Sequence, residues 1–334
     1  ERWDPALYYT SDKGDRDRVY SKWGGFLPPI AIDTVKLGIP PVSLKKIEPL
    51  QILTLELITR LFEQHSIDFS QQVRDRTAVF LGAGGGIGDM GGKYAARSEV
   101  ERIASAEKSD IYARLPEWGD ETFPGLLFNV VAGRVANRLN LKGASYTVDA
   151  ACASSLAAIY SAYRELTTSN CDLAIAGGVD TGQSPFAYLC FSRSQALSPT
   201  GRSMSFDQQA DGIAISEGLG VVVMKRLHDA LRDGDDIIAV IDGVGAASDG
   251  RGSSLTSPQS TGQQLAVERA WQSAGFPPSW MSLYEAHGTG TVAGDRTEIE
   301  TVLAITQRHA ASPQSCAVSS TKPNIGHTKS SAGI

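Results

Sequence analysis

The chain has 334 residues, 42% of them hydrophobic, and a formal net charge of −6. This length and composition allow a large buried core. The basic residues are scattered and form no cluster, which argues against a protein that binds nucleic acid or anionic membranes. No apolar run reaches the roughly eighteen residues of a membrane-spanning helix, and residues 1–4 do not resemble a signal peptide, so we expect a cytoplasmic protein.

The first fifty residues are predicted to be irregular. They mix charged residues, aromatic residues and prolines, which favours a segment that wraps the surface over one that builds the core. A helix is predicted over 50–64, where leucines recur at helical spacing, and another over 261–274.

Short apolar or β-branched segments bounded by glycine or turn residues predict buried strands. These segments are 77–81, 144–148, 173–176, 219–224, 237–244, 282–286 and 316–319. Strands alternating with helices indicate an α/β fold with mostly parallel sheets covered on both faces. A helix precedes a strand both before residue 81 and before residue 286, which suggests two related halves. No Pro-, Ser- or Gly-rich linker separates them, so we expect one domain over 1–334 with approximate halves 1–230 and 231–334.

Cys152 is the strongest candidate nucleophile. It lies where the strand predicted over 144–148 turns into a helix that runs to about residue 166. A thiol at a helix N-terminus faces unpaired backbone N–H groups and the positive end of the helix dipole, which favours the thiolate. Alanines flank it, so a substrate carbonyl can approach, and its own N–H can donate to an oxyanion. From the turn alone, a nucleophile and a small buried residue are equally good interpretations.

The other three cysteines lack this setting. Cys171, Cys190 and Cys316 are predicted to be buried structural residues. No Cys-x-x-Cys pair is present, so the sequence predicts neither a disulfide framework nor a metal site.

Two of the five histidines lie in glycine-rich loops directly after predicted strands. His287 is followed by Gly-Thr-Gly-Thr, and His327 is preceded by Lys-Pro-Asn-Ile-Gly. Open α/β sheets bind ligands beyond the carboxyl ends of their strands, so we expect both rings to converge with Cys152. A lone histidine in such a loop is more often structural, but two together with an activated thiol point to chemistry.

These residue types suit two successive steps. Acyl transfer needs a thiolate and an oxyanion hole, and decarboxylation of a malonyl-type thioester needs donors on the oxygen of the developing enolate. Two neutral imidazoles can supply those donors. Thr289 and Thr291 offer hydroxyls for the amides of a pantetheine arm. Glu298 and Lys322 can orient His327 or tune its charge, or form an ordinary ion pair.

Three segments together resemble the signatures of the β-ketoacyl-acyl-carrier-protein synthases, or ketosynthases. They are 149–155 around Cys152, 285–298 around His287, and 322–327 ending at His327. The stretch 196–218 is also similar to that family, so the resemblance covers almost the whole chain. It implies the thiolase fold, with two similar βαβ-rich halves in a five-layered αβαβα core, and a homodimer.

The resemblance also implies a reaction and its residues. An acyl group on Cys152 would undergo decarboxylative Claisen condensation with a malonyl thioester on an acyl carrier protein domain, in polyketide or fatty-acid extension. The domain itself would bind no cofactor or metal, because its substrates ride on the phosphopantetheine of the carrier. Catalytic roles fall to Cys152, His287, His327, Lys322 and Glu298, and substrate binding to Thr289, Thr291 and Phe206.

Within the family, segments 21–26, 190–193 and 326–333 are most similar to multidomain iterative synthases of polyunsaturated fatty acids and related polyketides. Family members usually have further strands before the segment that starts at residue 1 and after residue 334. We therefore expect a domain that is incomplete at both ends. Ala153 stands where many members have serine, and the position needs only a small side chain.

Three other enzyme or partner classes compete with this interpretation. A non-catalytic chain-length factor keeps the fold but lacks the nucleophile, whereas Cys152 and both histidines are present here. A thiolase uses cysteine and histidine but adds a second cysteine as base, and the segment 322–327 favours the decarboxylating enzyme. A cysteine hydrolase leaves the second histidine without a role.

A dinucleotide-binding loop is a weaker alternative. The glycines at 86–91 match its fingerprint after a strand. We expect no clean amphipathic helix to begin there, and no acidic residue lies at a convincing strand end about twenty residues later, so a flexible loop is the favoured interpretation.

Overall fold

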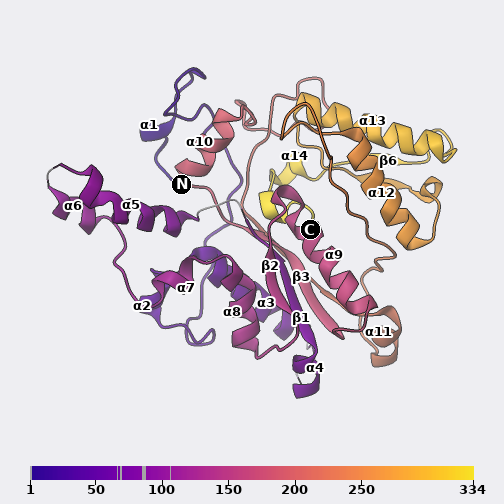
Figure 1. Cartoon of the computed structure of the whole chain (residues 1–334), viewed down its shortest axis with the longest axis horizontal. Helices are drawn as coiled ribbons and strands as arrows, with labels where there is room; N and C mark the ends of the chain where they lie inside the picture. The colour runs from indigo at the N-terminus through magenta and orange to yellow at the C-terminus, as the bar shows by residue number, and fades with distance from the viewer. Residues whose placement is uncertain (1, 66, 68–69, 85–87, 106) are drawn as a thin grey trace. The chain divides into compact units, whose positions relative to one another are not determined.

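A computed structural model describes the chain except for residues 1, 66, 68–69, 85–87 and 106 (Figure 1). The chain divides into two compact units. Unit 1 contains Glu1–Gly25, Gln183–Ser216 and Ala230–Thr328. Unit 2 contains Phe26–Gly182, Glu217–Asp229 and Lys329–Ile334. Each unit therefore draws on segments far apart in the sequence.

Unit 2 is built on a four-stranded sheet in the order β2-β1-β3-β4. The strands are β1 (Thr77–Gly82), β2 (Ser145–Val148), β3 (Leu173–Asp180) and β4 (Gly218–Met224). β1 pairs in parallel with β2 and β3, whereas β4 runs antiparallel to β3. Every residue of β1 and β3 is buried, as expected for central strands that are covered on both faces. The four strands predicted in this region are confirmed.

Helices cover both faces of this sheet (Figure 1). Ala78 and Phe80 of β1 belong to one apolar cluster with α9 (Ser154–Thr167). Val79 and Leu81 belong to another, with α3 (Pro49–Gln64) and α8 (Asn129–Leu139). Because successive strand side chains point to opposite faces, the two clusters lie on opposite sides of the sheet.

The predicted helix at 50–64 is confirmed as α3, but its buried face is wider than the leucine stripe. Leu55, Ile58 and Phe62 are buried, whereas Leu53 and Leu57 are only partly buried. The reason is that α3 packs against α8 and also against β3 and β4.

The remaining elements of unit 2 are short, apart from α5. They are α2 (Pro41–Leu44), α4 (Gln71–Asp75), α5 (Asp89–Ile103), α6 (Lys108–Ala113), α7 (Thr122–Leu126) and the 3-10 turns η1 (Ala151–Ala153) and η3 (Lys329–Ser331). Helix α11 (Leu227–Asp233) runs across the boundary between the units.

The start of α5 corrects one expectation. A helix does begin there, at Asp89 within the glycine-rich segment, and the buried Glu48 carboxylate accepts hydrogen bonds from Asp89 N (3.2 Å) and Met90 N (2.9 Å). The amides of the first turn are thus satisfied by a side chain about forty residues earlier, which no local pattern reveals. Residues 85–87 of the predicted flexible loop lie outside the described residues.

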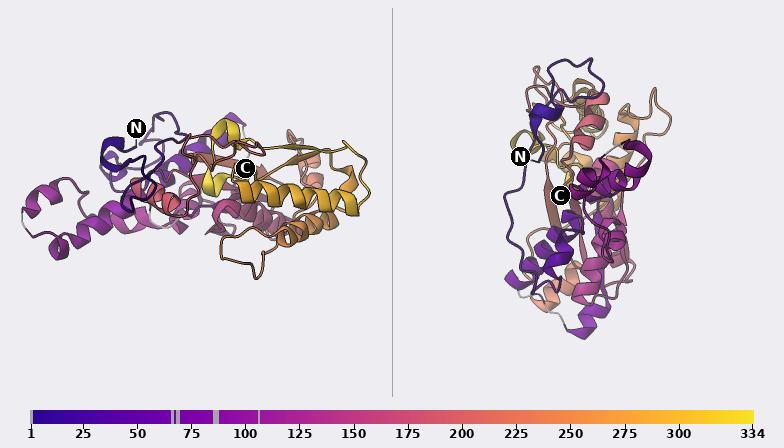
Figure 2. Two further views of the ribbon diagram at one scale, coloured as in Figure 1. Left: turned by 90° about the horizontal axis from the view of Figure 1, so that it is seen from above. Right: turned by 90° about the vertical axis from the view of Figure 1, so that its left-hand side faces the viewer.

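Unit 1 contains a two-stranded parallel sheet of β5 (Leu283–Glu285) and β6 (Ala317–Ser319). Helices α12 (Ser260–Ala274) and α13 (Val292–Arg308) pack against each other (Figure 2). The predicted helix at 261–274 and the predicted strands at 282–286 and 316–319 are confirmed. The other elements of unit 1 are α1 (Pro5–Tyr8), α10 (Pro185–Arg193), α14 (Lys322–Ile325) and the 3-10 turn η2 (Pro278–Trp280).

Two expectations about unit 1 are wrong. The segment 237–244 is irregular, and Ile238 in it is 94% exposed. A strand needs a neighbour for its backbone groups, and no strand pair among the described residues includes this segment. The N-terminal region is irregular as predicted, but it also builds core, because Val19 and Tyr20 are buried with Tyr188 and Leu197.

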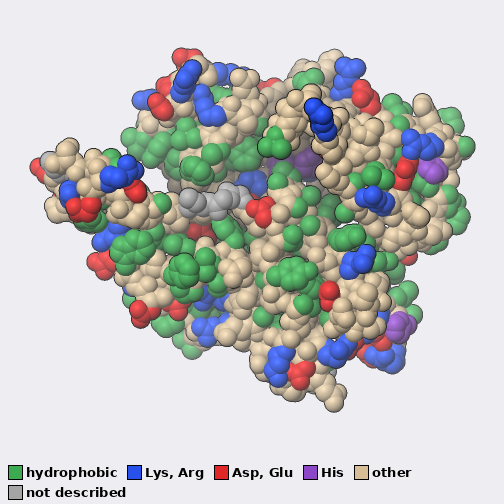
Figure 3. Space-filling model, viewed as in Figure 1, with side chains coloured by type: hydrophobic (Ala, Val, Ile, Leu, Met, Phe, Trp, Pro, Cys, Tyr) green, Lys and Arg blue, Asp and Glu red, His purple; other side chains and the backbone are tan. Residues whose placement is uncertain are grey.

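No helix within the described ranges combines the length and hydrophobicity needed to cross a bilayer. Basic and acidic side chains lie intermixed over the face seen in Figure 3. No broad area of one charge sign is visible on that face.

Candidate active site

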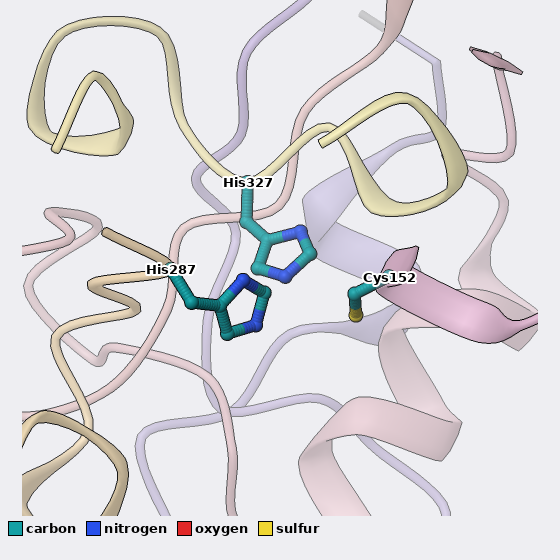
Figure 4. A group of neighbouring side chains, drawn as sticks. All are labelled: Cys152, His287 and His327. Carbon is teal, nitrogen blue, oxygen red and sulfur yellow. The ribbon is translucent and has the colours of Figure 1, made fainter. Parts of the chain in front are cut away.

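Cys152 lies in the turn η1, between β2 and α9, as the sequence predicted (Figure 4). Ala151 has φ +49°, in the left-handed region that non-glycine residues rarely adopt. Side chains from both ends of the turn stabilise it. The Asp149 carboxylate accepts from Ala151 N at 2.9 Å, and Ser154 Oγ accepts from Ala150 N at 2.8 Å. The turn presents Cys152 half-buried in front of the first turn of α9.

The end of β1 packs directly beneath this turn. A Cβ added at Gly82 would lie 2.4 Å from the carbonyl carbon of Ser154, and one at Gly84 would lie 2.2 Å from the carboxylate of Asp149. Both separations are shorter than van der Waals contact. The two glycines therefore permit the close approach that fixes the position of η1.

The remaining cysteines differ in their surroundings. Cys171 is buried, and burial raises its pKa to about 11, which keeps the thiol protonated. Cys316 is half-buried, and burial also raises its pKa. Cys190 on α10 is exposed, so the prediction that it is buried was wrong. Cys190 lies on the same exposed face of α10 as Phe186, four residues earlier, whereas Tyr188 and Ser192 form the buried face.

His287 and His327 lie side by side in unit 1. Their ring centroids are 5.3 Å apart, and the rings are nearly perpendicular, at 87° (Figure 4). His287 follows β5, and His327 follows α14 after Gly326, whose φ is +81°. The backbone of His327 is pinned on both sides, since its N–H donates to Ala214 O (2.7 Å) and its carbonyl accepts from Ser216 N (2.9 Å).

The local environment keeps the His287 ring neutral. Desolvation lowers its pKa from 6.5 to about 4, and the positive charge of Lys322 acts in the same direction, although the residue as a whole is exposed to solvent. A neutral imidazole carries one N–H donor and one acceptor nitrogen. His287 can therefore donate a hydrogen bond near pH 7 without being a strong acid.

The carboxylate of Glu298, on α13, holds the loop that carries His287. It accepts hydrogen bonds from His287 N at 2.6 Å and from Gly288 N at 2.8 Å, and the residue is 6% exposed. Burial raises the pKa of Glu298, while the two amides and Lys322 oppose that rise. Glu298 and Lys322 were expected to act on His327, but Glu298 bonds to the backbone around His287.

Asp295 is a loop-positioning residue that lies in the signature segment 285–298 but received no role from the sequence alone. Its carboxylate accepts from Phe206 N at 2.7 Å and from Gly290 N at 3.1 Å, and the residue is 6% exposed. Asp295 and Glu298 are three residues apart, so they share one face of α13. That spacing between two acidic residues just after a histidine loop is the signal that could have identified Asp295.

The predicted substrate-binding residues also gather at this loop. Phe206 has φ +62°, and a Cβ at Gly288 would lie 3.1 Å from its ring. The hydroxyls of Thr289 and Thr291 lie 2.9 Å apart and hydrogen-bond to each other. Lys322 is 5% exposed and lies close enough to influence the charge of both His287 and Glu298. The binding roles of these side chains stay predictions.

The two candidate centres belong to different units. Cys152 is in unit 2, and His287 and His327 are in unit 1. Each centre is well formed by itself, one as a stabilised cysteine turn and the other as a pair of imidazoles. The expected convergence of all three side chains stays a prediction.

Two protein-family models together match nearly the whole chain. The model for the N-terminal domain of β-ketoacyl synthases matches residues 1–230, and the model for their C-terminal domain matches residues 238–334.

Components of two large synthases are similar to this chain over its whole length. One component of the polyunsaturated fatty acid synthase of Thraustochytrium sp. is 34% identical over the whole chain, which covers 12% of that protein. One component of the phenolphthiocerol/phthiocerol polyketide synthase of Mycobacterium tuberculosis is 38% identical over the whole chain, which covers 17% of it. The chain is thus similar to a small part of each.

A solved structure has the same fold. The oxazolomycin ketosynthase domain of Streptomyces albus matches 99% of this chain with a TM-score of 0.87 and 30% identity, and the match covers 54% of that domain's chain. This likeness confirms the predicted thiolase-like α/β fold. The chain spans about half the length of that solved relative.

Proposed function

Because the chain belongs to the β-ketoacyl synthase family, we propose that it carries out decarboxylative Claisen condensation in polyketide or fatty-acid extension. The observation that carries the proposal is the pair of imidazoles at 5.3 Å, of which His287 is held neutral. A pair of imidazole N–H donors suits an enolate oxygen. It has no evident use in simple acyl transfer, which needs only one base.

In the first step, the Sγ of Cys152 attacks the carbonyl carbon of an acyl thioester. The N–H of Cys152 donates to the oxyanion that forms, and the stabilised turn η1 keeps that N–H in place. The bond between the carbonyl carbon and the carrier sulfur then breaks. The carrier thiol leaves with the proton that Cys152 gave up, and the acyl group stays on Cys152.

In the second step, the carbon–carbon bond of the malonyl thioester breaks and carbon dioxide leaves. The electron pair moves to the thioester oxygen, where His287 and His327 donate hydrogen bonds. Because His287 is neutral, it is a poor acid and does not quench the carbanion by protonation. The carbanion attacks the acyl carbonyl, the bond to Sγ breaks, and the Cys152 thiolate returns.

We further propose that both substrates arrive on the phosphopantetheine of an acyl carrier protein domain. The proposed enzyme works as a homodimer, and Cys152, His287 and His327 act in one cavity. Similarity to components of large synthases supports the carrier. Lys322 supplies a fixed positive charge beside His287 and Glu298, which supports a role in keeping His287 neutral. A cytoplasmic location stays a prediction.

The acylation step is tested with the full-length protein and an acyl-pantetheine thioester. Intact-mass measurement should show one added acyl group, which Cys152→Ala abolishes. The exposed thiol of Cys190 provides the matched control, and Cys190→Ala should leave acylation unchanged. Acylation that survives Cys152→Ala refutes the proposed nucleophile.

The decarboxylation step is tested by carbon dioxide release from a malonyl thioester. His327→Ala should slow this release far more than it slows acylation, and the exposed His228→Ala is the control. Equal losses of rate in acylation and decarboxylation would contradict the assignment of His327 to the decarboxylation step. A protein that is never acylated, despite being folded, would favour the chain-length-factor alternative.

A further inference from the structure

The segment that follows His327 packs on the turn that carries Cys152. The chain enters unit 2 for the last time at Lys329 and forms η3, which contacts η1, β3 and α9. Ser330 and Ser331 are each 3% exposed. Two residues later, Gly333 N donates to Ser155 Oγ, in the first turn of α9, at 2.9 Å.

Asp180, the last residue of β3, ties η3 to the sheet. Its carboxylate pairs with the ammonium of Lys329 at 3.0 Å and accepts hydrogen bonds from Ser330 N (3.3 Å) and Gly182 N (3.0 Å). The side chains of Asp180 and Lys329 are 6% and 13% exposed. Lys329 has φ +52°, a conformation that a lysine adopts only when its surroundings impose it.

β3, α9 and η3 pack tightly against one another at Gly178. A Cβ added at Gly178 of β3 would lie 2.5 Å from both the Ser155 Cβ and the Ser330 carbonyl oxygen. β3, α9 and η3 thus contact one another with no space for even a methyl group. A small shift of η3 is therefore transmitted to the start of α9 and to η1.

We propose that Asp180 and Lys329 are positioning residues for Cys152, an inference that rests on the nucleophilic role proposed above. A buried ion pair fixes its partners in one geometry, because a buried charge that loses its partner is destabilised. Asp180 binds both the side chain of Lys329 and the next backbone amide, so loss of either charge releases η3 from β3. Cys152 then loses the alignment, within about 0.5 Å, that attack on a carbonyl requires.

The test compares Lys329→Met, Asp180→Asn and the conservative Lys329→Arg in the full-length protein. The first measurement is single-turnover acylation of Cys152. The Met and Asn variants should lose on the order of tenfold or more in rate, and Arg should restore most of the loss, because it keeps the positive charge.

The second measurement is alkylation of Cys152 by iodoacetamide as a function of pH. In this reaction a sulfur–carbon bond forms and iodide leaves, so it reports the thiolate without a carrier domain. The pH midpoint should rise in Lys329→Met, where the Asp180 anion remains, and fall in Asp180→Asn, where the Lys329 cation remains. A purely structural role would lower stability without moving the midpoint in opposite directions.

Arg226→Met is the matched control. Arg226 forms another partly buried network in unit 2, with Asp172 at 2.5 Å and Asp229 at 2.6 Å, at the opposite end of β3. Its loss should lower the melting temperature but leave the alkylation midpoint of Cys152 unchanged. If Lys329→Met does not fold, the double variant with Asp180→Asn, which leaves neither charge unpaired, should still show the slower acylation.

Two outcomes separate this inference from the proposed function. Folded variants of Lys329 and Asp180 with wild-type acylation and unmoved midpoints overturn the positioning role while leaving Cys152 as nucleophile. A wild-type protein that is not acylated at Cys152 refutes the proposed function itself.

Discussion

Replacing Glu298 by glutamine tests whether this carboxylate positions the His287 loop. The two carboxylate oxygens accept from His287 N at 2.6 Å and Gly288 N at 2.8 Å. Glutamine keeps one acceptor but turns an NH₂ group toward the other amide, so one charge-assisted hydrogen bond is lost inside the protein. Such a bond contributes about 2 kcal/mol of stabilisation. If this stabilisation is lost in the transition state, the rate falls by roughly 30-fold.

The assay measures malonyl decarboxylation and Cys152 acylation separately in wild-type and Glu298→Gln protein. Decarboxylation should fall by about 30-fold, since it depends on the His287 donor, and acylation should change by less than about threefold. The control is Glu300→Gln on the same helix. Glu300 pairs with Arg296 at the surface, where the Glu300 side chain is 54% exposed. Loss of this ion pair should therefore destabilise the protein by at most about 0.5 kcal/mol.

The result that refutes this reasoning is a Glu298→Gln protein that decarboxylates malonyl thioester at the wild-type rate. Such a result would show that the loop of His287 keeps its position without the carboxylate. Equal losses in acylation and decarboxylation would also contradict it, because the effect would then not be specific to the His287 loop.

Three further predictions concern protonation and packing. Because the pKa of His287 is lowered from 6.5 to about 4, the unfolded chain binds its proton between those pH values and the folded chain does not. Urea titrations should therefore show wild-type stability falling relative to His287→Gln as pH drops from 6.5 to 4, and a constant difference across this window would contradict the lowered pKa. Gly82→Ala should destabilise the protein by about 1–3 kcal/mol in the same titration, because the new methyl group meets the backbone at the start of α9. Gly133 lies in the middle of α8, and a Cβ added there would have no neighbour within 4 Å, so Gly133→Ala should instead stabilise the protein by about 1 kcal/mol through helix propensity. A loss of stability in Gly133→Ala would show that this position is not open.

Local sequence patterns were sufficient to identify those elements whose burial follows from their composition. β1 and β3 are buried at every position because both of their faces are covered, and all their residues except Thr77 and Asp180 are apolar or glycine, so their segments could be recognised from sequence alone. The strand-to-helix setting of Cys152 followed from small residues between an apolar strand and a helical run. The segment 237–244 has the same composition as a strand, yet it is irregular, because strand formation also requires a neighbouring backbone.

The sequence by itself determined the fold class, most of the strands and helices, and which cysteine and histidines to consider. Those features depend on periodicity and on residues adjacent in the chain. Only the tertiary structure decided that Glu298 binds the amides of His287 and Gly288, and that Asp180 pairs with Lys329. These contacts join a side chain to a backbone amide or to a charge 10 to 150 residues away, and hydrogen bonds of that kind leave no periodic trace in the sequence.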